Sequence, residues 1–146
     1  MSGVLYTREI LRLAVSIPHQ QRLDNPDGTA DLRSRTCGST VTADVILANS
    51  GELQDLGLEI SACALGQASA AILGAQAVGK TAEDIGAVRD GLAAFLTGSA
   101  GIPGPWPDMD KLAAAREHKG RHAAILLPYD AVIAALADAV AKQEVA

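Results

Sequence analysis

Two runs of alternating apolar and polar residues, joined by a short turn, restrict the fold of this chain more than any other feature. The first run covers residues 40–47 and the second covers residues 55–62, with Asn-Ser-Gly at 49–51 between them. Alternation with a period of two places one face of each strand in the core. The pattern therefore predicts a β-hairpin, and a shorter strand at residues 30–35 could pair onto it. We expect Asp44 to face water from the outer side of the hairpin.

Apolar residues at helical spacing occupy much of the chain on both sides of these strands. Residues 4–17 have an amphipathic pattern that ends at Pro18. Residues 64–78 consist mostly of Ala, Leu, Ile and Val, which predicts a helix buried on most sides. Gly79 follows as a residue suited to the C-terminal end of that helix.

The second half of the chain continues as helices. Thr81 and Asp84 have the spacing of a capping box, which starts a helix. A short helix is expected over residues 108–117, and the last helix is expected to open near Pro128, because proline suits the first helical turn. Strands followed by helices indicate an α+β fold. We expect one domain over residues 1–146, with a small antiparallel sheet of about three strands packed by helices.

Charge and composition exclude several classes of protein. The formal net charge is −5, whereas nucleic-acid-binding domains are generally basic, so we expect no nucleic-acid partner. Charged residues interrupt the N-terminal apolar segment, and no run approaches the roughly 18 uninterrupted apolar residues of a membrane span. We therefore expect a cytoplasmic protein without membrane contact. In that compartment its two cysteines are expected to be thiols rather than a disulfide.

The hairpin geometry predicts that the two cysteines, Cys37 and Cys63, lie side by side. If the turn is centred on Ser50, directly opposed residues have numbers that sum to about 100, as 37 and 63 do. Opposed Cβ atoms in an antiparallel pair are roughly 4.5–5.5 Å apart. A single soft metal ion can bridge two thiolates at that separation. One interpretation is therefore a shared metal or sulfur site at the open end of the hairpin.

The neighbours of the cysteines favour the same interpretation. Cys63 directly precedes the predicted helix at 64–78, and helix N-termini favour the thiolate form, which binds metal and attacks sulfur. Gly38 follows Cys37 and lets the backbone approach a ligand closely. The alternative is that each cysteine is simply a small buried apolar residue. Two cysteines are also fewer than the four ligands of a closed zinc site, so a metal would need further ligands.

Four short segments share the order and the residue types of a known family. Residues 5–10 (LYTREI) open a helix, residues 35–38 (RTCG) hold the first cysteine, and residues 61–64 (SACA) hold the second. Residues 121–132 (RHAAILLPYDAV) are similar to the family's third motif and the start of its last helix. In these segments the chain resembles the NifU/IscU/SufU-type scaffolds of iron–sulfur cluster assembly. The resemblance covers most of the chain and implies a NifU-N-like fold, with a cluster or metal bound at both cysteines.

The chain departs from this family at the third cysteine of the family's pattern. The resemblance places that position at Ala124, which can neither bind metal nor carry sulfur. His122 lies two residues earlier and is the nearest replacement metal ligand, since imidazole can take the place of thiolate on iron or zinc. The alternative is that His122 belongs to a solvated basic loop. Ser39 and residues 117–121 also differ from the family, and the latter lack its chaperone-recognition sequence.

The resemblance implies a scaffold or carrier that receives iron and sulfur and delivers a cluster, with the [2Fe–2S] type expected. The implied partners are a cysteine desulfurase and acceptor apo-proteins, and a homodimer could complete the site. The missing third cysteine also allows a zinc-binding or metal-free sulfur-relay or activating partner of a cysteine desulfurase, or an adaptor that keeps only the fold. The sequence has no phosphate-binding loop, dinucleotide fingerprint or nucleophile elbow, so we expect no enzyme.

Overall fold

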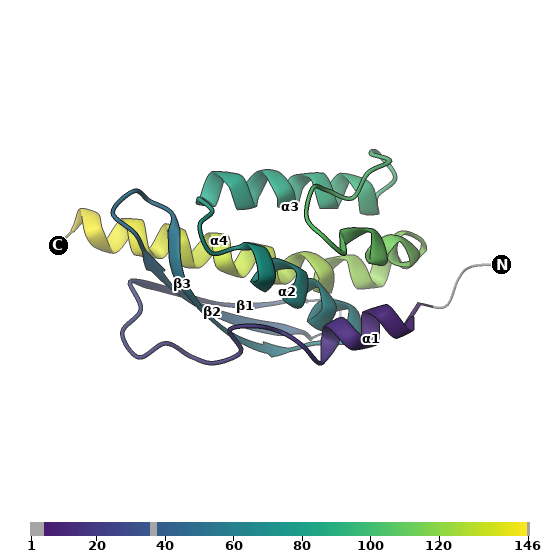
Figure 1. Ribbon diagram of the computed structural model, residues 1–146, viewed down its shortest axis with the longest axis horizontal. Coiled ribbons are helices and arrows are strands. Elements are labelled where there is room, and N and C mark those ends of the chain that lie inside the picture. The colour runs from purple at the N-terminus through teal and green to yellow at the C-terminus, as the bar shows by residue number, and fades with distance from the viewer. Residues whose placement is uncertain (1–4, 36–37, 146) are drawn as a thin grey trace.

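The computed structural model describes residues 5–35 and 38–145 and has the predicted α+β fold, with a three-stranded antiparallel sheet (Figure 1). The strands β1 (Gly28–Arg33), β2 (Thr40–Leu47) and β3 (Leu53–Ser61) are ordered β1-β2-β3. The helices are α1 (Arg8–Ala14), α2 (Ala64–Gln76), α3 (Ala82–Leu96) and α4 (His122–Glu144), with the 3-10 helices η1 (Met109–Glu117) and η2 (Lys119–Arg121) before α4. Helix α4 packs on β1 and β2 and also contacts α2 and α3, while α1 packs beside α2.

The helix ends follow the local signals in the sequence. Thr81 and Asp84 form the predicted capping box, because each side chain accepts a hydrogen bond from the backbone N–H of the other, at 3.1 and 3.0 Å. Nine of the thirteen residues of α2 are buried, which confirms the helix buried on most sides. Gly79 has φ 93° and donates its N–H to the carbonyl oxygen of Leu53, so the end of α2 is tied to β3.

The register between β2 and β3 differs by one residue from the predicted one. Thr40 pairs with Ser61, so opposed residues sum to 101 rather than 100 over most of the ladder. The reason is an irregularity beyond Ile46, where Leu47 pairs with Leu53 and one extra residue of β3 bulges out. Cys37 lies outside the described residues, so the structure does not test the prediction that Cys37 and Cys63 are opposed.

Asp44 is buried in this structure, and the expectation that it faces water is wrong. Its side chain is 0% exposed, because the polar segment that follows α1 folds over this part of the sheet. Arg22 donates from Nε to Oδ2 at 2.6 Å, Thr29 donates its hydroxyl to Oδ1 at 2.8 Å, and the Leu23 N–H donates to Oδ2 at 3.0 Å. Burial raises the pKa of Asp44, but these hydrogen bonds outweigh it and hold the pKa below its ordinary value.

Helix α4 begins at His122, six residues before the predicted start at Pro128. Pro128 is buried inside the helix, and since it has no N–H, the carbonyl oxygen of Ala124 lacks its usual helical donor. The packing of this apolar helix on the sheet outweighs the loss of one helical hydrogen bond.

Residues 119–144 are long and apolar enough to span a membrane, but 56% of their most apolar window is buried inside the protein. The burial of α4 in the core therefore explains its apolar character.

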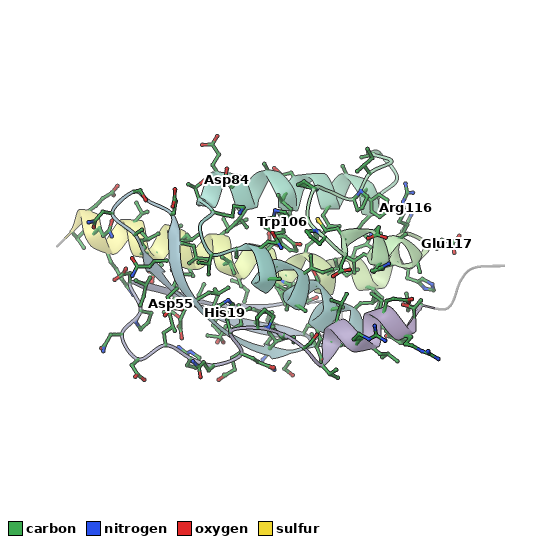
Figure 2. The ribbon with its side chains drawn as sticks, viewed as in Figure 1. His19, Asp55, Asp84, Trp106, Arg116 and Glu117 are labelled. Atoms are coloured by element: carbon green, nitrogen blue, oxygen red, sulfur yellow. The ribbon has the colours of Figure 1, made fainter. Side chains whose placement is uncertain are left out.

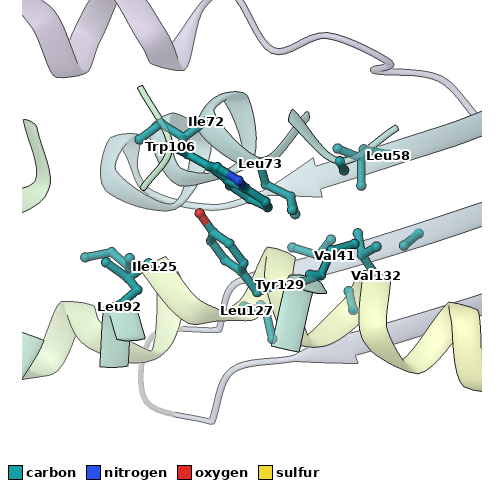
Figure 3. Close-up of a cluster of buried hydrophobic side chains, with 14 of the residues drawn as sticks. Val41, Leu58, Ile72, Leu73, Leu92, Trp106, Ile125, Leu127, Tyr129 and Val132 are labelled. Carbon is teal, nitrogen blue, oxygen red and sulfur yellow. The ribbon is translucent and has the colours of Figure 1, made fainter. Parts of the chain in front are cut away.

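The Gly/Pro-rich loop before η1 is anchored on α4 by an aromatic pair. Trp106 is 8% exposed, and its ring stacks on that of Tyr129, with the ring centroids 6.0 Å apart and the planes 19° apart (Figure 3). The buried hydroxyl of Tyr129 has no hydrogen-bond partner among the described residues. This pair joins the loop to the core that α2, α4 and the sheet share.

Candidate functional site

Cys63 stands at the junction where β3 ends and α2 begins. It is the N-cap residue of α2, with φ −65° and ψ 169°, and its side chain makes no capping hydrogen bond. The carbonyl oxygen of Cys63 accepts the Gln67 N–H at 3.0 Å, which holds the first turn. The thiol is half-buried, in contact with the core but still accessible.

The turn between β1 and β2 lies at the same end of the sheet as Cys63, because Thr40 at its end pairs with Ser61. The turn is closed by two backbone hydrogen bonds, from Ser34 N–H to Ser39 O at 2.8 Å and from Gly38 N–H to Ser34 O at 3.1 Å. Gly38 has φ 71°, in the left-handed region that favours glycine. The described residues that flank Cys37 in the sequence are therefore held at the end of the sheet where α2 starts.

Ala124, where the sequence resemblance predicts the third cysteine position, packs against the first turn of α2. A Cβ added to Gly66 would lie 3.6 Å from the Cβ of Ala124 and 3.2 Å from its carbonyl oxygen. Ala124 is 1% exposed. One turn further along, the Ser69 hydroxyl donates to the carbonyl oxygen of Ile125 at 2.6 Å and ties the same two helices. The predicted third ligand position thus lies against the helix that Cys63 opens.

His122 has a different environment from Ala124. Its Nε2 atom lies 2.8 Å from the carbonyl oxygen of Ala115, to which it donates in the matching tautomer. Its side chain also lines a cavity of about 430 Å³ whose other lining residues belong to the end of α3, to η1 and to the segment that follows. Two residues along an α-helix differ by about 200° in direction. His122 and Ala124 therefore lie on roughly opposite faces of α4.

The described residues provide one soft ligand at the site. In residues 5–35 and 38–145, no three His, Cys, Asp or Glu side chains gather closely enough to hold a metal ion.

Gly66 is the residue that sequence reasoning missed. A glycine in the first turn of an otherwise Ala-rich helix is a signal that could have found it, because glycine there costs helix stability unless another backbone approaches.

Comparison with known proteins places this geometry in a family. No protein-family profile and no curated protein matches the sequence. Among solved structures, the N-terminal part of a nitrogen-fixing NifU-like protein from Brucella abortus is 34% identical, with a TM-score of 0.84, and the match covers 94% of this chain and 96% of that one.

Two further solved structures share the fold at lower identity. A candidate scaffold for iron–sulfur cluster assembly in the SUF system, from Fervidobacterium islandicum AW-1, is 20% identical over 90% of this chain and 96% of its own, with a TM-score of 0.79. A hypothetical protein is 19% identical over 91% of this chain and 97% of its own, with a TM-score of 0.71. Because the NifU-like protein is matched at 34% identity over almost its whole length, this chain belongs to the NifU/IscU/SufU family.

Proposed function

We propose that this protein is an assembly scaffold or carrier for iron–sulfur clusters, with Cys37 and Cys63 as its cysteine ligands. The observation that carries the proposal is the position of Cys63 at the start of α2, at the end of the sheet where Ser34 and Ser39 are joined by a backbone hydrogen bond. The likeness to a NifU-like protein and to a SUF-system scaffold supports the same role. The protein would bind and release its cargo rather than catalyse an enzymatic reaction.

The ligand set would make this an atypical, weakly holding site. Two thiolates leave at least two positions of a tetrahedral iron or zinc open, and Ala124 at the third position supplies no side-chain ligand. Sulfide, a partner's side chain or a second copy of the chain would complete the coordination. A cargo held by few protein ligands is exchanged readily, which suits delivery of a [2Fe–2S] cluster to acceptor apo-proteins after a cysteine desulfurase has supplied the sulfur.

His122 stays the sequence-based candidate for a third ligand. Its imidazole would have to leave the carbonyl oxygen of Ala115, and it lies on the side of α4 opposite to the one on which Ala124 packs.

Anaerobic purification followed by iron, zinc and acid-labile sulfide analysis tests the proposal. We expect iron and sulfide in comparable amounts in the unaltered protein, and loss of both in Cys37→Ala and in Cys63→Ala. Ser61→Ala is the matched control, because Ser61 is exposed at the end of β3, two residues before Cys63. Absence of iron and sulfide after reconstitution of the folded protein would contradict the scaffold role.

A second candidate function is a sulfur relay or activating partner of a cysteine desulfurase, with zinc or no metal. The observation that favours it is Ala124, which removes one cluster ligand from the family's site but leaves both cysteines. Zinc without sulfide, or sulfur bound to Cys63 in the absence of iron, would support this alternative over the scaffold.

A further inference from the structure

A groove lies between the end of β1, α3 and α4. Its volume is about 390 Å³, and its polar lining consists of Arg33, Ser34, Arg35, Arg89 and Asp130. Its apolar lining, called the apolar floor below, comes from three residues of α4: Ala123, Leu126 and Leu127. Leu126 is half-exposed and Ala123 is exposed, so part of this apolar floor faces the open groove.

The arginines of the groove carry more positive charge than their surroundings neutralise. Arg89 donates from Nε to Oδ1 of Asp130 at 2.9 Å, which fixes one guanidinium at the rim. Arg33 and Arg35 form no ion pair with any residue in the part of the chain that the structure describes. Guanidinium groups bind carboxylates through paired hydrogen bonds. Arg33 and Arg35 could therefore each bind a carboxylate beside the apolar floor of the groove.

The distribution of charge over the whole protein supports this local excess. The described segments at the Cys63 end of the molecule, residues 5–14, 33–35, 38–40, 61–66 and 94–124, contain eight of the twelve Lys and Arg but only four of the seventeen Asp and Glu. This end therefore has a formal charge of +4, and the remainder has −9. Figure 2 shows Arg116 beside Glu117 at the end of the molecule where α1 lies, and the acidic side chains of Asp55 and Asp84 toward the other end. Such a field steers an acidic surface toward the cysteines.

We propose that this groove binds a short segment of a partner protein in which an apolar side chain is flanked by carboxylates. The apolar side chain would cover Leu126, and the carboxylates would pair with Arg33 and Arg35. The inference rests on the proposed function, since the partner would be one that supplies sulfur to the cysteine site or takes a cluster from it. A nucleic acid is a poorer occupant, because the charge of −9 on the rest of the molecule repels a long polyanion.

Fluorescence anisotropy with three labelled peptides tests the chemistry of the occupant. We expect Asp-Glu-Leu-Glu-Asp to bind, and Asn-Gln-Leu-Gln-Asn and Asp-Glu-Ser-Glu-Asp to bind at least about tenfold more weakly, a change equal to about 1.4 kcal/mol. Equal binding of the leucine and serine peptides would overturn the role of the apolar floor. Tighter binding of a labelled oligouridylate, or full competition by inorganic phosphate at equal concentration, would assign the arginines to another ligand and also overturn the proposal.

Matched charge variants locate the binding to the groove. We expect Arg33→Glu and Ala123→Glu to weaken binding of the acidic peptide at least about tenfold, because each places a carboxylate in the groove. The controls are Arg12→Glu on α1, which matches the charge change of Arg33→Glu, and Ala137→Glu on α4, which matches that of Ala123→Glu. Both control residues are exposed, and we expect each variant to change the affinity for the acidic peptide less than about twofold. If the control variants weaken peptide binding equally, the weakening results from the net charge of the protein, and the proposal of a local binding site is contradicted.

The proposal and the scaffold role fail separately. Iron and sulfide loading needs no partner, so Arg33→Glu and Ala123→Glu should load as the unaltered protein does. Peptide binding by a protein that takes up no iron would remove the scaffold role alone. Full loading without peptide binding would remove the groove proposal alone.

Discussion

Gly66 in α2 and Ala124 in α4 approach so closely that a Cβ on Gly66 would lie 3.2 Å from the carbonyl oxygen of Ala124. The same added Cβ would lie 2.8 Å from the Cβ of Ala62, one residue before Cys63. The first turn of α2, the start of α4 and the end of β3 therefore meet around the second cysteine. Small side chains at these positions let three backbones converge there.

Replacing Gly66 with alanine should separate these elements. Because the added methyl group would overlap Ala62, we expect Gly66→Ala to lower the free energy of unfolding by about 1–3 kcal/mol. Urea denaturation measures the change. Gly91→Ala in α3 is the control: its Cβ meets no atom within 4 Å, and alanine there should raise stability by about 0.5–1 kcal/mol. Equal effects in the two variants would show that the close approach is unimportant.

Restoring a thiol at the vacant position should strengthen cargo binding. We expect Ala124→Cys to increase iron and sulfide bound after anaerobic reconstitution several-fold, because it adds a soft ligand against the helix that Cys63 opens. Ala131→Cys, also buried in α4, controls for the extra thiol. If both variants load alike, the position of the third ligand has been misassigned.

The role of His122 can be separated from that of the cysteines. Since its Nε2 already bonds to Ala115 O and Ala124 occupies the other face of α4, we expect His122→Ala to keep most of its iron under conditions in which Cys63→Ala loses it. Metal analysis of both purified variants decides the point. Equal loss in the two would support the imidazole as a ligand, which must then leave the carbonyl oxygen of Ala115 when cargo binds.

Asp44 should link stability to acidic pH. Its pKa is held below the ordinary value of about 3.9, so the ionised form stabilises the fold at neutral pH and this stabilisation is lost as pH falls through the acid range. Asp44→Asn should therefore lower neutral-pH stability by about 2–4 kcal/mol and flatten the dependence below about pH 5. Thermal unfolding from pH 7 to 3 measures both. Asp31→Asn, at an exposed site on β1, should leave the profile nearly unchanged.

The hydroxyl of Tyr129 is expected to cost stability. Burial raises its pKa and keeps it protonated, yet it has no hydrogen-bond partner among the described residues. Tyr129→Phe should preserve the stacking on Trp106 and raise the free energy of unfolding by about 1 kcal/mol. A clear loss of stability would instead show that a buried water satisfies this hydroxyl.

Local patterns predicted much of the fold because their free energies act within a few residues. The alternation of the hairpin, the apolar run of α2 and the Thr81–Asp84 capping box are each complete within one segment. The start of α4 was predicted wrongly from Pro128. There the local preference of proline was weaker than the burial of apolar side chains against a sheet that lies far away in the sequence.

The sequence alone determined the fold class, the family, and the end of the hairpin to which the residues around Cys37 and Cys63 belong. Only the tertiary structure decided the register of β2 on β3, the burial of Asp44, and the side of α4 on which Ala124 and His122 lie. The bulge, the segment over Asp44 and the start of α4 all result from packing between segments distant in the chain. No local period or cap encodes such packing, because its free energy appears only when the distant surfaces meet.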